Sequence, residues 1–292
     1  MKRNLFLFTG FGFLGLNLSK YFKNKKYNIK LLGNKKKLPF KVNFNKNKIK
    51  FIKCNIFNTK ILNKYKFKNS VIVLTTLNSN KKNFIKKFKH LVEYLAEKKP
   101  KKIILISSVS VYGNNKKNKI STLNQYAKNC HNAEYISKVN FKNLTILRLA
   151  NIFGILRKKP GSIEKITMQY LLLKKYKFFK YDTFRSYISI DEFCLILEKM
   201  INVKEKGIIY NVSNNKFIFK LKEILKFYQN YYGKKIILTR NNSSPLIKKS
   251  IINNNKLLKK INYRQFKSFD KEISKLDIFY KKYYLQKKIF NL

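Results

Sequence analysis

The chain is poor in acidic residues and has no tryptophan. Its 292 residues include 13 aspartates and glutamates against 67 lysines and arginines, a formal net charge of +54. A field of this sign attracts polyanions such as nucleic acid or an anionic membrane surface. The lysines are spread along the whole chain, however, and the wealth of Lys, Asn, Ile, Phe and Tyr is what an AT-rich coding sequence favours. We therefore expect only non-specific polyanion binding at low salt.

Cysteine and histidine are also scarce. The three cysteines, Cys54, Cys130 and Cys194, form no C-x-x-C pair, and the only histidines are His90 and His131. A structural zinc site takes about four such ligands at short spacing, so no metal site is expected. A small, odd number of cysteines is typical of a reducing compartment, and it predicts a cytoplasmic protein.

Long uncharged hydrophobic runs are absent, so no membrane span is expected. Lys2 and Arg3 precede an apolar stretch, as in a signal peptide, but no small-residue cleavage site follows and glycines interrupt the stretch. The length of the chain allows a full hydrophobic core, in one large domain or in two closely joined lobes.

The N-terminal 22 residues contain the most informative pattern. Residues 4–9 form an apolar run, residues 10–15 read G-x-G-x-x-G, and residues 16–22 are amphipathic. This order predicts a strand, a tight turn and a helix, the arrangement that binds a dinucleotide. The alternative is a glycine-rich turn in an unrelated α/β fold.

Each glycine of this loop has a mechanical reason in the dinucleotide interpretation. Gly10 permits the turn off the strand, Gly12 lets a pyrophosphate approach the backbone, and Gly15 lets the helix pack closely on the sheet. The free N–H groups at the helix N-terminus then face the phosphates. The predicted cofactor contacts from the loop are Gly10, Phe11, Gly12, Phe13, Leu14 and Gly15.

Apolar runs alternate with amphipathic segments along the chain, which favours a parallel sheet covered by helices. We expect an α/β fold with a Rossmann-type doubly wound parallel sheet and a smaller C-terminal substrate-binding lobe. The NAD(P)-binding domain is expected over residues 1–155, with strands near 187–190 and 208–212 returning to it, and residues 156–292 form most of the lobe. The further strands are expected at 27–32, 49–54, 71–75, 102–107 and 144–149, and the helices at 13–23, 84–98, 126–138, 163–175, 220–232, 253–260 and 268–284.

Six segments in order resemble the extended short-chain dehydrogenases/reductases of the NAD-dependent epimerase/dehydratase family. After the glycine loop come ISSVSVYG (106–113), YAKNCHNAE (126–134), LRLANIFG (147–154), RSYISIDE (185–192) and YNV (210–212). They are similar to the family's S-S-x-x-V-Y-G, Y-G-x-S-K-x-x-x-E, L-R-x-x-N-V-Y-G, R-D-F-I-H-V-D-D and Y-N-V. The glycine loop departs by one residue from the family's usual T-G-x-x-G-x-x-G.

The resemblance implies NAD or NADP as cofactor and a nucleotide-activated sugar as substrate. In the family a tyrosine acts as acid and base while a serine binds the reacting oxygen, and by position these are Tyr126 and Ser108. A free tyrosine has a pKa of about 10, so serving as a base near pH 7 requires ~4 kcal/mol of preferential phenolate stabilisation. The family obtains it from the cofactor and from a lysine one helical turn later, a cofactor-binding position that Cys130 occupies here.

Cys130 leaves two functions open, because cysteine carries no fixed positive charge. The chain is an NAD(P)-dependent epimerase, dehydratase or reductase, or it is a catalytically degenerate, NAD(P)-binding regulatory or RNA-associated relative. Tyr112 and Lys116 form a second Tyr-x-x-x-Lys pattern, although it follows Ser108 closely. We interpret Cys130 as a small buried apolar residue and not as a nucleophile.

Four further residues complete the predicted site. By resemblance, Arg185 would clamp the substrate phosphates, and Asn151 either binds substrate or caps the loop after its strand. Asn34 follows the second strand, where NAD-specific folds place an acid, and the lysines at 35–37 give a slight preference for NADP. Asn55 stands where the family often has an aspartate near the adenine. The resemblance also allows a homodimer formed through the helices at 84–98 and 126–138.

Overall fold

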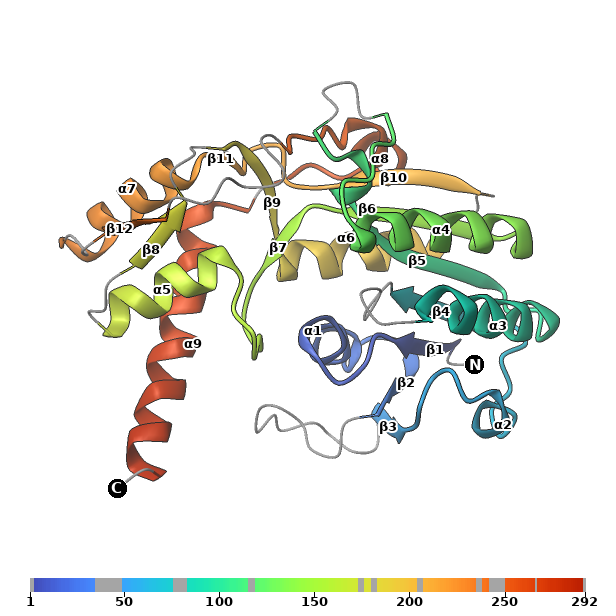
Figure 1. Ribbon diagram of the computed structural model, residues 1–292. Helices are drawn as coiled ribbons and strands as arrows, with labels where there is room; N and C mark the ends of the chain where they lie inside the picture. The colour runs from blue at the N-terminus through green and yellow to red at the C-terminus, as the bar shows by residue number, and fades with distance from the viewer. Residues whose placement is uncertain are drawn as a thin grey trace.

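A parallel sheet of seven strands forms the centre of the protein (Figure 1). The computed structural model describes residues 3–34, 49–75, 83–114, 119–172, 176–179, 183–203, 207–234, 238–241, 250–265 and 267–290. Within these ranges the sheet consists of β1 (Arg3–Phe8), β2 (Tyr27–Gly33), β3 (Ile49–Lys53), β4 (Val71–Thr75), β5 (Lys102–Ser108), β6 (Leu144–Leu149) and β10 (Ile208–Val212). The order across the sheet is β10-β6-β5-β4-β1-β2-β3, which confirms the predicted doubly wound Rossmann-type fold.

The winding of the sheet reverses at β1. This strand pairs with β2 on one side and with β4 on the other, so consecutive strands are laid down in opposite directions from the centre. In such sheets the chain leaves neighbouring strands on opposite sides and opens a crevice at their carboxyl ends. The glycine loop follows β1 directly and Ser108 ends β5, so the topology brings both to this edge.

Helices cover both faces of the sheet. The helices α1 (Phe13–Phe22) and α6 (Ile190–Asn202) pack on one face, and α3 (Phe84–Glu97) and α4 (Gln125–Asn140) pack on the other. Alternate residues of β1 point to opposite faces, and both sets are buried. A parallel strand that is buried on both faces has a continuous apolar sequence, and this run is the feature that predicts the strand.

Local sequence also sets the helix boundaries. The helix α3 buries an apolar stripe at spacings of three and four residues, as an amphipathic helix must: Phe84, Phe88, Leu91, Val92 and Leu95. The helix α4 begins where the Asn124 side chain accepts a hydrogen bond from the Ala127 N–H at 2.8 Å. Three shorter helices are also present in the described residues: α2 (Thr59–Leu62), the 3-10 helix η1 (Val109–Tyr112) and α8 (Asn255–Lys260).

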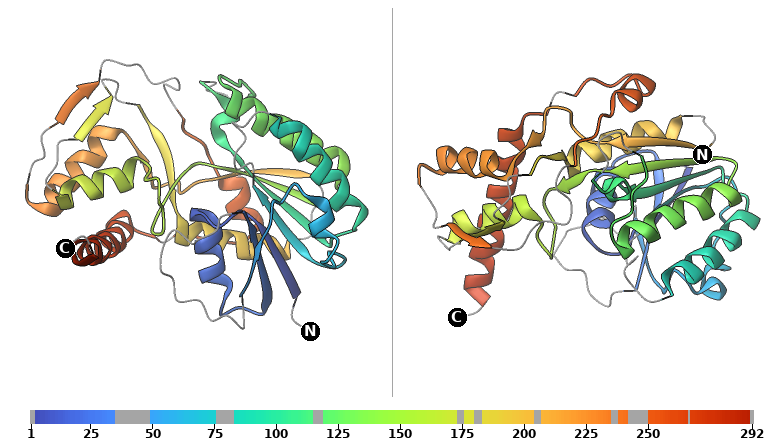
Figure 2. Two further views of the ribbon diagram at one scale, coloured as in Figure 1. Left: turned by 60° about the horizontal axis from the view of Figure 1, so that its bottom comes forward. Right: turned by 45° about the horizontal axis from the view of Figure 1, so that its top comes forward.

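The remaining elements lie beside the sheet (Figures 1 and 2). They are β7 (Asn151–Phe153), β9 (Arg185–Ser189) and β11 (Ile218–Phe219) in one small sheet, β8 (Tyr176–Phe179) and β12 (Leu238–Asn241) in another, and the helices α5 (Ser162–Leu172), α7 (Leu221–Tyr232) and α9 (Phe269–Phe290). Their shared core is rich in aromatic rings. Tyr170 stacks on Tyr228 and Tyr232 with ring centroids 5.5 and 5.2 Å apart.

The strand expected near 187–190 lies outside the seven-stranded sheet. We expected it to return to the NAD(P)-binding domain; β9 pairs with β7 and β11 in the three-stranded sheet. The edge of the main sheet next to β6 is occupied by β10, over five paired residues. The helix that follows β9, α6, does return and packs against α1.

Within the described ranges, no helix combines the length and the apolar character needed to cross a bilayer.

Candidate active site at the carboxyl edge of the sheet

A cavity of about 720 Å³ lies at the carboxyl edge of the parallel sheet. Its wall comes from the start of α1, the ends of β4, β5 and β6, the start of α4, the strand β7, the segment that leads into α5, and one residue of β9. Its lining includes Gly12, Phe13, Leu14, Ser108, Tyr126, Asn151, Arg157, Lys158, Lys159, Gly161 and Glu164. One hollow therefore joins the predicted dinucleotide loop to the predicted catalytic pair.

The glycine loop turns sharply and packs tightly. Gly10 has a φ of +68°, in the left-handed region, and its N–H donates to the Leu32 carbonyl at 3.1 Å. A Cβ on Gly15 would lie 2.0 Å from the Gly10 carbonyl oxygen and 2.7 Å from Thr9 Oγ1. No side chain fits there, so Gly15 is what allows α1 to approach the loop.

Gly12 contrasts with Gly15. A Cβ built on Gly12 meets no atom within 4 Å, so this glycine serves no packing need in the protein itself. It also occupies the N-cap of α1, where no side chain caps the helix. Exposed N–H groups and the positive end of the helix dipole therefore face the cavity, which is the setting in which phosphates bind.

Phe11 points away from this cavity. Its side chain is buried in the core and lies edge-on to Phe51, with ring centroids 5.8 Å apart. Phe13 and Leu14 line the cavity. Of the predicted loop contacts, Phe11 thus offers a ligand its backbone alone.

Ser108 and Tyr126 both line the cavity. Ser108 ends β5, where its hydroxyl donates to Ser110 Oγ at 3.0 Å and accepts from the Ser110 N–H at 3.2 Å. Tyr126 stands in the first turn of α4 and is partly buried against a small apolar cluster. The folding of two distant segments thus brings the predicted serine and tyrosine to one cavity wall.

The second Tyr-x-x-x-Lys pattern is arranged differently. Tyr112 is buried, and its hydroxyl donates to Asn211 Oδ1 at 2.7 Å. Its ring also contacts the guanidinium of Arg148, 4.8 Å from the centroid. Tyr112 is not among the residues that line the cavity, and Lys116 lies outside the described residues. The geometry favours Tyr126 as the tyrosine of the site.

Cys130 follows Tyr126 by one helical turn and is fully buried. It belongs to an apolar cluster with Val109, Val111 and Ile252, and it does not line the cavity. These surroundings favour the interpretation of Cys130 as a small core residue, and they leave its predicted contact with a cofactor without support.

A buried polar network lies next to the segments that carry Ser108 and Tyr126. Glu134 of α4 accepts from Arg148 of β6, with Nε to Oε1 at 3.0 Å and Nη2 to Oε2 at 2.6 Å. The hydroxyl of Ser107, next to Ser108, donates to the same Oε1 at 2.6 Å. The network therefore joins the three elements that carry or flank the predicted catalytic residues.

The predicted substrate residues occupy different positions. Asn151 lines the cavity, and its Nδ2 donates to the Ser186 carbonyl at 3.1 Å, which ties β7 to β9. Arg185 begins β9 and donates to the Phe184 carbonyl at 3.2 Å, but it is not part of the cavity wall. Burial lowers the pKa of the Arg185 guanidinium, and the nearby Tyr187 partly offsets this.

The two asparagines predicted near the adenosine end are exposed. Asn34 follows β2 directly, and the lysines at 35–37 that suggested NADP lie outside the described residues. Asn55 follows β3 closely, and its Oδ1 accepts from the Phe57 N–H at 3.2 Å within a turn. Neither asparagine lines the cavity.

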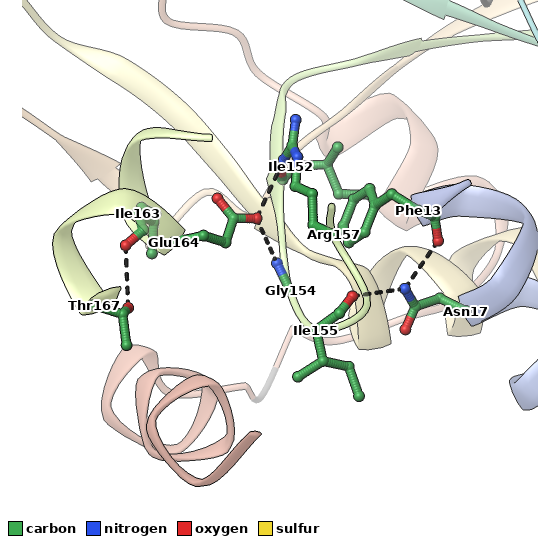
Figure 3. A network of polar contacts seen from close by, with 9 residues as sticks. All are labelled: Phe13, Asn17, Ile152, Gly154, Ile155, Arg157, Ile163, Glu164 and Thr167. Carbon is green, nitrogen blue, oxygen red and sulfur yellow. Dashed lines mark hydrogen bonds and ion pairs between the residues drawn. The ribbon is translucent and has the colours of Figure 1, made fainter. Parts of the chain in front are cut away.

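Sequence reasoning missed an ion pair in the cavity wall, between Arg157 and Glu164 (Figure 3). Arg157 Nη1 lies 3.2 Å from Glu164 Oε1 and 2.5 Å from the Ile152 carbonyl oxygen, to which it donates. Its guanidinium also contacts the Phe13 ring, 4.8 Å from the centroid. The scarcity of both arginine and glutamate in a lysine-rich chain is the signal that could have singled these residues out.

Asn17 strengthens the same junction from α1. Its Nδ2 donates to the carbonyl oxygens of Phe13 and Ile155, both at 2.9 Å (Figure 3). The dinucleotide loop and the segment leading to α5 are therefore joined directly. Across the described part of the chain, no group of three or more His, Cys, Asp or Glu side chains is placed to hold a metal ion.

Comparison with solved structures gives the same fold throughout. The dTDP-glucose 4,6-dehydratase of Bacillus anthracis, in complex with NAD, is 17% identical with a TM-score of 0.83, covering 96% of this chain and 97% of that one. The UDP-glucose 4-epimerase of Thermotoga maritima, with UDP-glucose, is 16% identical with a TM-score of 0.81, covering 96% and 99%. The ADP-L-glycero-D-manno-heptose-6-epimerase of Helicobacter pylori is 20% identical with a TM-score of 0.74, covering 94% and 95%.

At such low sequence identities, the likeness to these structures establishes the fold alone. A search of curated protein sequences finds no match. The family comparison, by contrast, matches residues 6–213, a span that contains the glycine loop, Ser108, Tyr126 and the β10 strand. The chain belongs to the NAD dependent epimerase/dehydratase family.

Proposed function

We propose that the protein binds NAD or NADP and acts as an epimerase, dehydratase or reductase on a nucleotide-activated sugar. One observation carries the proposal: the uncapped start of α1, Ser108 and Tyr126 all line a single cavity. The B. anthracis structure contains NAD and the T. maritima structure contains UDP-glucose, which supports both ligand classes.

The glycine loop fits the diphosphate of a dinucleotide. Gly12 leaves its surroundings open, and the first N–H groups of α1 are available at the cavity. When bound, the nicotinamide would take or give a hydride at a carbon of the sugar. The choice between NAD and NADP rests on the sequence after Asn34, which slightly favours NADP because lysines suit a 2′-phosphate.

The chain's own residues would manage the proton. Tyr126, as the phenolate, would accept the proton of the sugar hydroxyl that becomes a carbonyl, and the resulting Tyr126 hydroxyl would return that proton in the reverse direction. Ser108 would hydrogen-bond the reacting oxygen and hold it toward Tyr126. The Ser108 hydroxyl is oriented by Ser110, so its position is set before substrate arrives.

The other end of the cavity suits the charged part of a nucleotide sugar. Arg157, Lys158 and Lys159 all line it, and a diphosphate carries the opposite charge. We propose that Asn151 contributes to this end and that Arg185 reaches it only after rearrangement. In this proposal, residues up to 155 with β10 and α6 form the dinucleotide-binding domain, and most of the remainder forms the substrate lobe.

A second candidate function is a catalytically degenerate relative that keeps the cofactor pocket. Cys130 favours it, because a fully buried thiol stands where the family has the lysine that lowers the tyrosine pKa. Non-specific polyanion binding at low salt, including RNA, would accompany either function because of the net charge of +54.

Assembly and location are further proposals. Tyr135 and Val139 lie one turn apart on α4 and are 68% and 69% exposed, which favours a homodimer formed through α3 and α4. The three cysteines are buried and none forms a disulfide within the described residues, in keeping with the reducing cytoplasm that the sequence suggests.

The direct test measures cofactor binding and turnover. Calorimetry with NAD and NADP comes first, followed by incubation with a panel of nucleotide sugars and product identification by NMR. We expect Tyr126→Phe to abolish turnover while cofactor binding stays within twofold of wild type. The matched control is Tyr112→Phe, which should retain turnover. Failure of the wild type to bind either cofactor would refute the proposal, and binding without turnover would favour the degenerate alternative.

A further inference from the structure

Glu164 has one oxygen occupied and one oxygen without a partner. The side chain is fully buried at the start of α5 and belongs to the cavity wall. Its Oε1 accepts from the Gly154 N–H at 3.1 Å and from Arg157 Nη1 at 3.2 Å. Its Oε2 has no hydrogen-bond partner among the residues that the structure describes. Figure 3 shows the two oxygens pointing in different directions, with the contacts on one of them.

The position next to this oxygen is a glycine for reasons of space. A Cβ on Gly161 would lie 2.8 Å from Glu164 Oε2 and 3.1 Å from Arg157 Nη1. The φ of Gly161 is not in the left-handed region, so the backbone does not require a glycine there. Gly161 also lines the cavity. A side chain at this position would therefore press on the unpartnered oxygen and on the guanidinium beside it.

The carboxylate is also held rigidly. Arg157 is fixed by the Ile152 carbonyl and by its contact with the Phe13 ring, and it holds Oε1 in turn. Rotation of Glu164 to satisfy Oε2 would break the contacts of Oε1. A buried acceptor left in this state is costly, and it marks a place where a ligand completes the hydrogen bonding.

We propose that Glu164 Oε2 accepts a hydrogen bond from a hydroxyl or amino group on the sugar of the substrate. The inference rests on the proposed function and assigns a specificity-determining residue to it. The phosphates are excluded as the partner because a carboxylate repels them, whereas the exposed cations Lys158 and Lys159 on the same wall attract them. A neutral or cationic donor then remains as the partner, and the hydroxyl and amino groups of the sugar are donors of this kind.

Glu164→Gln tests this assignment. The variant keeps the length of the side chain and one acceptor for Gly154 and Arg157, but it replaces Oε2 by a donor. The control is Glu93→Gln on α3, which makes the same charge change at an exposed position away from the cavity. Calorimetry with each nucleotide sugar that the wild type binds is paired with the matching nucleoside diphosphate and with NAD or NADP.

We expect Glu164→Gln to weaken nucleotide-sugar binding at least tenfold while affinities for the nucleoside diphosphate and the dinucleotide change less than twofold. Glu93→Gln should change none of them. Gly161→Ala, which presses a methyl group toward Oε2 without removing either charged side chain, should show the same selective loss. If Glu164→Gln does not fold, Gly161→Ala decides alone.

Three outcomes overturn the inference. Equal loss of the nucleotide sugar and the nucleoside diphosphate would mean that Glu164 shapes the pocket generally. Unchanged nucleotide-sugar binding would mean that Oε2 faces no substrate group; in both cases the proposed function stands. A wild type that binds the dinucleotide but no nucleotide sugar would instead remove the proposed function, and this inference with it.

Discussion

Glu134 and Arg148 form a bidentate ion pair in the protein interior, with Nε–Oε1 and Nη2–Oε2 distances of 3.0 and 2.6 Å. Burial alone would lower the pKa of Arg148, but the hydrogen bonds and charge of Glu134 outweigh it and the pKa is raised. The guanidinium therefore stays charged, and α4 stays fixed to β6. Tyr126 stands on the same helix, so its place in the cavity depends on this pair.

Removing one partner of the pair should destabilise the protein far more than replacing both partners with apolar residues. We expect Glu134→Leu to destabilise the protein by about 3–5 kcal/mol, because Arg148 is left as an unpaired buried charge. The double variant Glu134→Leu, Arg148→Met should recover most of that loss, since no charge is then buried. Urea unfolding of the two single variants and the double variant measures this coupling. Losses that simply add would show that the two side chains act independently.

Gly12 and Gly15 should respond differently to alanine. Gly15→Ala forces a Cβ to within 2.0 Å of the Gly10 carbonyl, so we expect a loss of roughly 1–3 kcal/mol or failure to fold. Gly12→Ala meets no protein atom, so the melting temperature should change little. Its methyl group would, however, stand where the proposed cofactor phosphates approach, and we expect dinucleotide affinity to fall at least tenfold. Calorimetry beside thermal unfolding separates the two effects, and unchanged affinity in Gly12→Ala would place the phosphates elsewhere.

Cys130→Lys restores the lysine that the family carries one turn after the tyrosine. The site is fully buried among apolar side chains, so we expect a large loss of stability from added volume and charge. If the wild type is degenerate, the variant that still folds should turn over at least tenfold faster. Cys130→Ala is the control and should leave turnover unchanged. A wild type already working at about 10 s⁻¹, an ordinary enzyme rate, would rule out degeneracy.

Glu192 should make stability depend on pH. Burial, opposed by hydrogen bonds from Asn214 and Gln265, raises its pKa from 4.5 to about 7. The folded state thus holds a proton that the unfolded state releases, so this stabilisation is complete below pH 4.5 and is lost as the pH rises to 7. Between pH 5 and pH 8 the wild type should lose roughly 2–3 kcal/mol relative to Glu192→Gln, which cannot ionise. Urea unfolding of both proteins at the two pH values tests this. An equal change in the free energy of unfolding of the two proteins would contradict it.

Substitution on α4 tests the proposed homodimer. Tyr135→Glu with Val139→Lys should convert a dimer to a monomer, because it places charges on the exposed apolar face. Ile278→Glu changes a residue of similar exposure (64%) on α9 and should leave the dimer intact. Sedimentation equilibrium gives the mass of each. A dimer unaffected by the α4 changes would move the interface to another surface.

Much of the sheet could be predicted from the sequence. The strands at 71–75, 144–149 and 208–212 have the expected bounds. The strand at 71–75 is the clearest case, because a parallel strand buried on both faces is a nearly continuous apolar run. The glycine loop was also readable, since the spacing of Gly10, Gly12 and Gly15 reflects local geometry. Sequence patterns were sufficient for features that depend only on residues close together in the sequence.

The rest depended on tertiary contacts. The strands β7 and β11 have three and two residues, which is too short for a period of two to appear. The role of Glu164 depends on Gly154, Arg157 and Gly161, which no spacing rule connects. The pairing of β9 with β7 and β11, and of β10 with β6, depends on contacts between distant segments. Hydrophobic periodicity indicates which side of a strand or helix is buried, and it does not indicate which other element packs against that side.

The contacts of Asn17 and Phe13 with residues 155 and 157 also constrain how the protein is made. The first helix leaves the ribosome about 140 residues before its partners, so the loop cannot reach its final packing during the first half of synthesis. Until Ile155 and Arg157 emerge, the Asn17 amide and the Phe13 ring remain open to solvent or to other partners. The earliest segment of the chain therefore completes its packing only after about half of the chain has been made.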